Sequence, residues 1–151
     1  MILQIIGKGL KTGFALAAAT TAAIMISSDR ELGSPWAAIN DVAHIVDGDE
    51  KEQPTEFSQR ESGLGVFVNG TAMCAWGVLY EGALTVTKQK SNIAYGMLAS
   101  AIAYGIDYYI VPKQYTPGIE KKLSGASIFT AYTLLGLTLG LSGLWNKSDQ
   151  E

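Results

Sequence analysis

Residues 123–145 read LSGASIFTAYTLLGLTLGLSGLW, and no charged side chain occurs in this stretch. A helix that crosses the hydrocarbon core of a bilayer needs roughly 20 consecutive, mostly apolar residues, since each residue advances the helix by about 1.5 Å. The stretch meets this requirement more clearly than any other part of the chain. It therefore predicts a membrane-spanning helix, which we place at residues 121–145.

Three further stretches meet the same requirement, at residues 12–28, 64–81 and 92–111. A chain of 151 residues is long enough for one ordinary domain. We therefore predict an all-α fold, a membrane-spanning four-helix bundle that forms a single transmembrane domain over residues 1–151. The first stretch has an alternative interpretation as a signal peptide, because two lysines precede its apolar run. We favour an uncleaved span.

The charges are few and unevenly distributed. Charged residues make up 17% of the chain, against about 25% in soluble domains, and nine of the fourteen acidic residues lie in a polar loop at 29–62. The net charge is −3 and the longest basic run is Lys121-Lys122, so the clustered positive surface that nucleic acid requires is missing. One cysteine and one histidine exclude a Cys-rich zinc site. We predict no nucleic-acid partner, no metal and no cofactor.

The polar loop contains the signal of one short amphipathic helix. Ser34 followed by Pro35 has the pattern of an N-cap and a first helical residue, and the helix would run to Val46. Four residues at helical spacing form an apolar stripe: Trp36, Ile39, Ala43 and Val46. We expect this helix to lie on the membrane surface or against the bundle, followed by a mobile polar segment at 49–62.

The cap-then-proline pattern recurs at Thr116 and Pro117. We expect the fourth helix to begin there. Ile119 and Leu123 would then lie on its inner face before the helix enters the bilayer.

Small residues at four-residue spacing predict where helices meet, because lipid supplies no hydrophobic force between helices and close backbone contact must replace it. Gly136 and Gly140 form such a pair on the fourth helix, and Gly96 and Ser100 form one on the third. We favour packing within the bundle. The alternative is that the face of Gly136 and Gly140 docks a partner or a second copy of the chain.

Polar side chains inside the spans are the strongest functional signals, because a carboxylate near the bilayer centre costs roughly 2.5–3.5 kcal/mol. Asp107 lies in the third span, beside Tyr104 and Tyr108. Since tyrosines gather at membrane interfaces, we favour an interfacial anchor paired with a nearby lysine over an ion or proton site. Asn69 of the second span would lie at a similar depth, and a hydrogen bond between Asn69 and Asp107 would satisfy both groups.

The loop helix carries a second polar group. Asn40 and His44 are one turn apart and share a face with Asp47. One histidine with an amide and a carboxylate does not make a metal site, so this face would cap the bundle or meet water, with titration near neutral pH as the alternative for His44. The candidate residues of a polar pocket are therefore Asn40, His44, Asn69, Tyr104, Asp107 and Tyr108.

Catalytic signatures are missing from the chain. It has no GxSxG, HExxH, nucleotide-binding or dinucleotide-binding pattern. Cys74 has no histidine beside it in a span, and Glu81 is expected to be a snorkelling charge at the end of the second span. We therefore predict no enzymatic activity. Acid–base chemistry by Asp107 or Glu81 on a membrane substrate is the least supported alternative.

Three blocks resemble a family of small bacterial inner-membrane proteins of unknown function: SPWAAINDVAHIVDGD (34–49), GVFVNGTAMCAWGVLYE (65–81) and AYGIDYYIVPKQYTPGIEKKLS (103–124). This chain departs from the family where it has Asn69, Gly70 and Thr71 in place of a histidine near the start of the second span. The resemblance implies a multi-pass topology and no activity. It points to Asn40, His44, Glu81, Asp107, Tyr108, Pro112, Pro117 and Glu120.

These patterns favour an integral membrane protein without catalysis: an accessory or structural subunit, or an oligomeric membrane component. Its partners would be membrane lipids and another membrane protein or further copies of the chain. The alternative is a small transporter, or a lipid- or small-molecule-binding protein, that uses the pocket around Asp107, Asn69 and His44. The resemblance implies the bacterial inner (cytoplasmic) membrane, and the lysines before the first span favour both termini in the cytoplasm.

Overall fold

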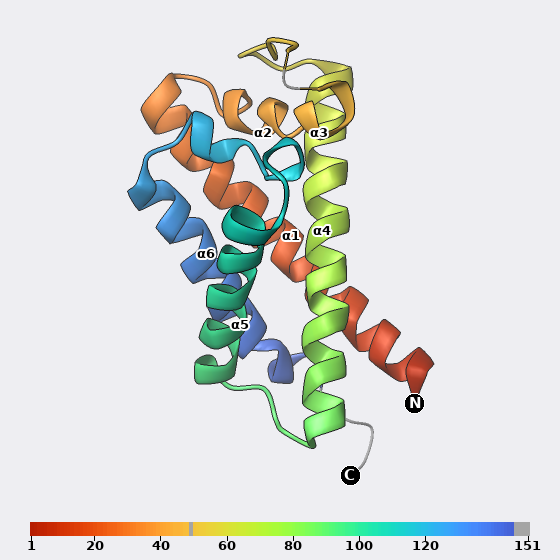
Figure 1. The fold of residues 1–151 in the computed structure, drawn as a ribbon. Helices are drawn as coiled ribbons and strands as arrows, with labels where there is room; N and C mark the ends of the chain where they lie inside the picture. Colours follow the sequence, from red (N-terminus) through yellow and green to blue (C-terminus); the bar gives the residue numbers. More distant parts are fainter. Residues whose placement is uncertain (49, 147–151) are drawn as a thin grey trace.

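The computed structural model describes residues 1–48 and 50–146, and all regular elements of these residues are helical, as predicted (Figure 1). The long helices are α1 (Ile2–Leu32), α4 (Gln59–Thr87), α5 (Ile93–Gly105) and α6 (Gly125–Gly140). The short elements are α2 (Ala37–Asp41), α3 (His44–Asp47), the π-helix η1 (Ile106–Ile110) and the 3-10 turns η2 (Lys113–Tyr115), η3 (Ile119–Lys121) and η4 (Ser142–Leu144).

The two ends of the bundle differ. α2, α3 and the connection from η1 to α6 cover the upper end in Figure 1, which we call the capped end. The start of α1 and the end of α6 lie toward the opposite end, which we call the terminal end.

Three helical stretches are long and apolar enough to cross a membrane: α1, α4 and residues 125–144, which combine α6 with η4. The predicted third span differs, because α5 ends at Gly105 and the chain continues as a π-helix to Ile110. Val111 is extended, with φ −66° and ψ 132°, which is the conformation favoured before a proline such as Pro112. The prediction of one regular α-helix over 92–111 was therefore wrong in its second half.

Hydropathy located the apolar parts of the helices but not their ends. α1 begins at Ile2 rather than at residue 12, and α4 runs from Gln59 to Thr87 rather than from 64 to 81. Polar residues continue a helix without penalty outside the apolar region, whereas local caps stop it. Gly33 ends α1 with φ 74°, and its N–H binds the carbonyl of Asp29, as expected of a left-handed helix terminus.

The predicted amphipathic loop helix is instead a buried plug. Its two short helices, α2 and α3, meet at Val42 and Ala43, and residues 37–44 are all buried. Val46, the last residue of the predicted apolar stripe, is 59% exposed. The stripe fails as a guide because α1, α4 and η3 all contact α2, so burial in this segment follows tertiary contacts and not one apolar face.

α6 begins later than predicted. Its N-cap is Ser124, whose side chain accepts the N–H of Ser127, and not Thr116. Gly118, with φ 82°, turns the chain into η3 first. Ile119 and Leu123 are buried, as expected, although they lie before α6 rather than on it.

Glycines set the two closest helix contacts. A Cβ atom added to Gly77 of α4 would lie 2.3 Å from the carbonyl oxygen of Gly9 in α1, and one added to Gly96 of α5 would lie 2.2 Å from the carbonyl oxygen of Gly136 in α6 and 2.4 Å from the nitrogen of Gly140. These distances leave no room for a side chain. Gly136 and Gly140 therefore face α5 within the same chain.

Candidate functional site

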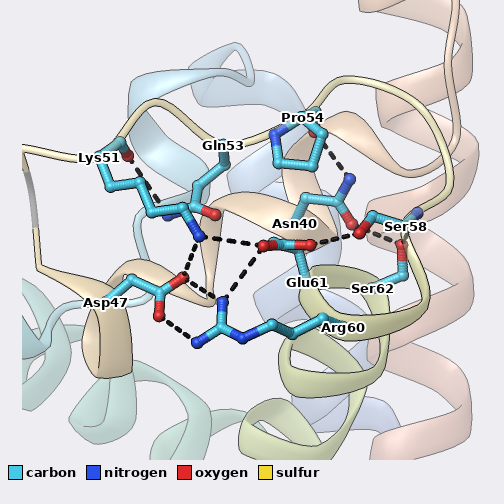
Figure 2. A network of polar contacts seen from close by, with 9 residues as sticks. All are labelled: Asn40, Asp47, Lys51, Gln53, Pro54, Ser58, Arg60, Glu61 and Ser62. Atoms are coloured by element: carbon cyan, nitrogen blue, oxygen red, sulfur yellow. Dashed lines mark hydrogen bonds and ion pairs between the residues drawn. The ribbon is translucent and has the colours of Figure 1, made fainter.

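Asn40 is the centre of a hydrogen-bond network at the capped end (Figure 2). Its side-chain nitrogen donates to the carbonyls of Pro54 (2.7 Å) and Glu56 (2.8 Å), and its oxygen accepts from the hydroxyl of Ser62 (2.7 Å). The residue is completely buried. Because these bonds use both groups of the amide, Asn40 fastens the segment before α4 to α2 and is not directed into a cavity.

Four charged side chains form an ion cluster beside this network: Asp47, Lys51, Arg60 and Glu61 (Figure 2). Arg60 contacts Asp47 at 2.6 Å, and Lys51 lies 3.1 Å from Asp47 and 3.0 Å from Glu61. The hydrogen bond from Arg60 holds the pKa of Asp47 well below its usual range. The cluster and the bonds of Asn40 tie residues 51–58 to the bundle, in contrast to the mobile segment that the composition predicts.

His44 lies beneath the connection to α6. It is 5% exposed, its Nδ1 atom lies 2.6 Å from the carbonyl oxygen of Asp41, and a Cβ atom added to Gly118 would lie 2.6 Å from its ring. His44 is not among the residues that line the two cavities described below. The structure therefore separates Asn40 and His44 from the remaining pocket candidates.

Asn69 and Asp107 line a small inner cavity of about 110 Å³, but their side chains bind different partners. The amide of Asn69 donates to the hydroxyls of Thr20 (3.2 Å) and Thr21 (2.9 Å) on α1. Asp107 accepts a hydrogen bond of 2.7 Å from the hydroxyl of Tyr132 on α6. The expected bond between Asn69 and Asp107 is replaced by these two, and Tyr132 takes the place of the lysine as the partner of Asp107.

A larger outer cavity of about 590 Å³ lies between α5 and α6. Tyr132 lines both cavities, so its ring stands between them while its hydroxyl reaches Asp107. The outer cavity is lined by Met97, Ser100, Ala101, Tyr104, Tyr108, Glu120, Leu123, Gly125, Ile128, Phe129, Tyr132 and Thr133.

Three rings form one wall of the outer cavity, which we call the tyrosine wall: Tyr104, Tyr108 and Tyr132. Their centroids are 4.9 Å apart for Tyr104 and Tyr108, 5.2 Å for Tyr104 and Tyr132, and 6.0 Å for Tyr108 and Tyr132. Such tilted and edge-to-face pairs are the favoured arrangement of aromatic rings. The π-helix η1 follows Tyr104 and contains Tyr108. Single π turns inside α-helices are frequent at functional sites.

A second buried polar group lies at the terminal end. The carboxylate of Glu81 accepts hydrogen bonds of 3.0 Å each from the hydroxyl of Thr12 and the amide of Asn146. Glu81 is 6% exposed and lies well inside α4, so the expectation of a snorkelling end charge was wrong. The two neutral donors come from α1 and from the segment after η4. The carboxylate of Glu81 therefore fastens these two segments to α4.

Sequence reasoning missed Tyr132 and selected Glu120 only through the resemblance. Tyr132 has a phenolic hydroxyl within an otherwise apolar span, and buried tyrosines usually find a hydrogen-bond partner. This tendency would have paired Tyr132 with Asp107, the one acid in the neighbouring predicted span. The position of Glu120 could not be read in this way, because it depends on the course of the connection between η1 and α6.

The described residues contain no group of three or more His, Cys, Asp or Glu side chains that could hold a metal ion. Comparisons with protein-family models, curated proteins and solved structures find no significant match to this chain. The resemblance to an inner-membrane family stays a prediction. The outer cavity is suited to binding, since it is a largely apolar space with a few polar groups in its lining.

Proposed function

We propose that this chain is an integral membrane protein that holds an amphipathic small molecule in the outer cavity between α5 and α6. The observation that carries the proposal is the composition of this cavity. Tyr104, Tyr108 and Glu120 supply polar groups to a lining that is otherwise largely apolar and includes Met97 and Phe129. A molecule with one polar and one apolar end fits such a lining.

Exposed apolar side chains support the placement in a membrane. Phe14 and Phe67 are each 69% exposed and Phe129 is 72% exposed, on three different helices. In water such a surface would promote aggregation or association, whereas lipid tails solvate it. In this proposal α5 and η1 together form a fourth crossing, and α2 and α3 close the bundle at one membrane surface.

The orientation belongs to the same proposal. The lysines and arginines do not decide it by number, since the described segments of the terminal end contain four and those of the capped end contain six. The proposal rests on Lys8 and Lys11 before the first span, because the first span usually dominates the topology. We therefore place the terminal end in the cytoplasm and the capped end outside. Labelling of cysteines introduced at Lys90 and Glu56 with a membrane-impermeant maleimide tests this orientation, because only Glu56→Cys should react from outside.

A role as an accessory subunit remains the second candidate, and one groove favours it. A space of about 410 Å³ lies between α4 and α5, lined in part by Leu84, Leu98 and Ile102. α5 packs mainly against α6, and α4 packs mainly against α1, so a helix of another protein has access to this side of the bundle.

Native mass spectrometry of the full chain, extracted gently from its membrane, distinguishes the two candidates. We expect a protomer that carries a bound small molecule or lipid. Ala101→Trp would fill the outer cavity and abolish the adduct. Ala94→Trp is the matched control, because Ala94 is exposed on the same helix and does not line this cavity.

Two results would contradict ligand binding. A protomer without any adduct, or an adduct that Ala101→Trp leaves unchanged, would remove the outer cavity as the site. A stoichiometric protein partner in place of the adduct would instead support the accessory role, with the groove between α4 and α5 as the first surface to change.

A further inference from the structure

The charges around the outer cavity indicate which polar head group it would accept. Glu120 is the only charged residue among those that line it, and no lysine or arginine takes part. A carboxylate repels an anionic head group and attracts a cationic one. The lining is therefore unfavourable for a phosphate, sulfate or carboxylate.

The two aliphatic hydroxyl groups of the cavity are engaged within the protein, so the neutral phenols of Tyr104 and Tyr108 are the hydroxyl donors that remain for a ligand. Ser100 donates to the carbonyl of Tyr132, and Thr133 donates to the carbonyl of Phe129. A hydroxyl that already donates its proton can only accept a further hydrogen bond. An anionic ligand needs donors, which these two side chains do not offer.

Glu120 has capacity for a cation. It is exposed in η3 and accepts one hydrogen bond of 3.0 Å, at Oε1 from the hydroxyl of Thr116. Within the described part of the chain, no ion pair involves Glu120. This differs from Asp47 and Glu61, whose carboxylates are paired with Lys51 and Arg60.

The tyrosine wall offers a second attraction for the same charge. A cation within about 6 Å of an aromatic face is attracted to it, and quaternary ammonium groups are recognised by this contact in many proteins. Tyr104 is 39% exposed, so the wall is accessible from outside. The outer cavity is thus lined by one carboxylate and three phenol rings. Both kinds of group attract an ammonium ion.

The acidic character of the whole capped end points in the same direction. The segments at this end, residues 29–62 and 106–122, contain ten acidic residues and six lysines or arginines in the described part of the chain. A surface of one predominant sign raises the local concentration of ligands of opposite charge. The acids at the capped end are Asp29, Glu31, Asp41, Asp47, Glu50, Glu52, Glu56, Glu61, Asp107 and Glu120.

From these observations we infer that the outer cavity selects amphiphiles with a cationic head, an amine or a quaternary ammonium group. The head would lie between Glu120 and the tyrosine wall, and the tail would extend along α5 toward Ala101 and Met97. This inference rests on the proposed function, since it assigns the chemistry of the same cavity.

Four eight-carbon compounds with different heads test the selection: octyltrimethylammonium, octylphosphocholine, octyl sulfate and octanol. Each is titrated by calorimetry into the full chain in uncharged maltoside micelles, with empty micelles subtracted. We expect octyltrimethylammonium to bind about tenfold more tightly than octanol and octyl sulfate to bind least, since a carboxylate and aromatic faces act together.

The source of the ligand follows from one further comparison. Octylphosphocholine has the same trimethylammonium group but adds a phosphate, as a phospholipid head group does. We expect it to bind several-fold more weakly than octyltrimethylammonium, because the cavity lacks a cation for the phosphate. Equal binding of the two would point to a membrane phospholipid as the occupant in place of a free cationic amphiphile.

The variants separate charge selection from binding itself. Glu120→Gln should reduce the affinity for octyltrimethylammonium about three- to tenfold and leave octanol unchanged, because the amide keeps the shape and loses the charge. Glu56→Gln is the matched control, since Glu56 is an exposed acid at the same end that does not line the cavity.

The failure of the inference and the failure of the proposed function give different results. Equal affinities of all four compounds, each lost in Ala101→Trp, would overturn the cationic selection and leave the cavity as a binding site. Binding of no compound, or binding that Ala101→Trp does not affect, would overturn both.

Discussion

The helix pairs α1/α4 and α5/α6 both meet through glycines, and the larger of the two cavities lies at the second pair. In α1/α4, Gly9, Gly13 and Gly77 lie at the crossing. Leu16 and Met73 then fill the core beside it. The α1/α4 contact is therefore filled beside its glycines, and the inner cavity of about 110 Å³ lies farther along, at Thr20 and Asn69.

In α5/α6 the glycines lie toward one end and large rings lie toward the other. Gly96 fits against Gly136 and Gly140 near the terminal end, and the next turns toward the capped end bring Tyr104 and Tyr132 together at 5.2 Å. Small residues permit close backbone contact, whereas bulky rings keep the helix axes apart. The outer cavity follows from this change in residue size along one helix pair.

Glycine-to-alanine substitutions give the most direct test of this comparison, and the largest expected effect. Gly77→Ala and Gly96→Ala each place a Cβ atom within 2.3 Å of a backbone oxygen of the facing helix. Inserting a methyl group into a filled contact costs about 1–3 kcal/mol. We expect both variants to lower the melting temperature, as measured by circular dichroism in maltoside micelles.

The matched controls are Gly70→Ala on α4 and Gly105→Ala at the end of α5, where an added Cβ would meet nothing within 4 Å. These changes should stabilise the helices by about 0.5–1 kcal/mol, because alanine restricts the unfolded chain more than glycine does. If all four substitutions had the same effect, the glycines would not be what holds the helix pairs together.

Periodicity and composition predicted the helical class and the small-residue pairs that face one another in α5/α6. They could not predict the contact at Gly9 and Gly13, although these glycines also lie four residues apart. Lysines at positions 8 and 11 led us to start the predicted span at residue 12, which placed Gly9 outside it and Gly13 inside. The contact depends on α1 continuing as a helix beyond its apolar part, which hydropathy does not report.

The predicted pocket residues separate into two groups in the structure, and tertiary contacts are again the reason. Asp107, Tyr104 and Tyr108 are close in sequence, and helix geometry alone brings them together. Asn40 and His44 share a helix face with polar character, but tertiary contacts cover that face. A buried polar group satisfied by the protein and one directed at a ligand have the same sequence pattern, and only the arrangement of the neighbouring elements separates them.

The bond between Tyr132 and Asp107 is the polar feature that distinguishes α5/α6 from α1/α4, and its removal should have an intermediate effect. Tyr132→Phe leaves the carboxylate without this donor, at a cost of about 1 kcal/mol in a membrane environment. We expect a lower melting temperature and little change of binding in the outer cavity, because phenylalanine keeps the ring that lines this cavity. Calorimetry and circular dichroism of the same sample measure both.

Tyr109→Phe is the control for this variant, since Tyr109 is 80% exposed and does not line either cavity. Asp107→Asn should be milder than Tyr132→Phe, because the amide oxygen still accepts from the phenol. Equal stability of Tyr132→Phe and Tyr109→Phe would mean that the bond contributes nothing to the α5/α6 contact.

The ion cluster at the capped end fastens the connection before α4, and its contribution should be the smallest. The pKa of Asp47 is lowered in the folded chain by Arg60 and Lys51, against about 3.9 in an unfolded chain. A carboxyl group with a lowered pKa stabilises the fold above the unfolded pKa, and this contribution is lost as the pH falls through the folded pKa. Stability should therefore decrease below about pH 4.

Melting temperatures at pH 6 and pH 3 test this dependence. Arg60→Gln should reduce the difference between the two pH values by about 1–3 °C, because exposed ion pairs contribute little and the substitution removes the main cause of the lowered pKa of Asp47. Arg30→Gln should keep the difference of the unmodified chain, since no ion pair of the described residues involves Arg30. A pH difference that Arg60→Gln leaves intact would assign the acid sensitivity to other carboxylates.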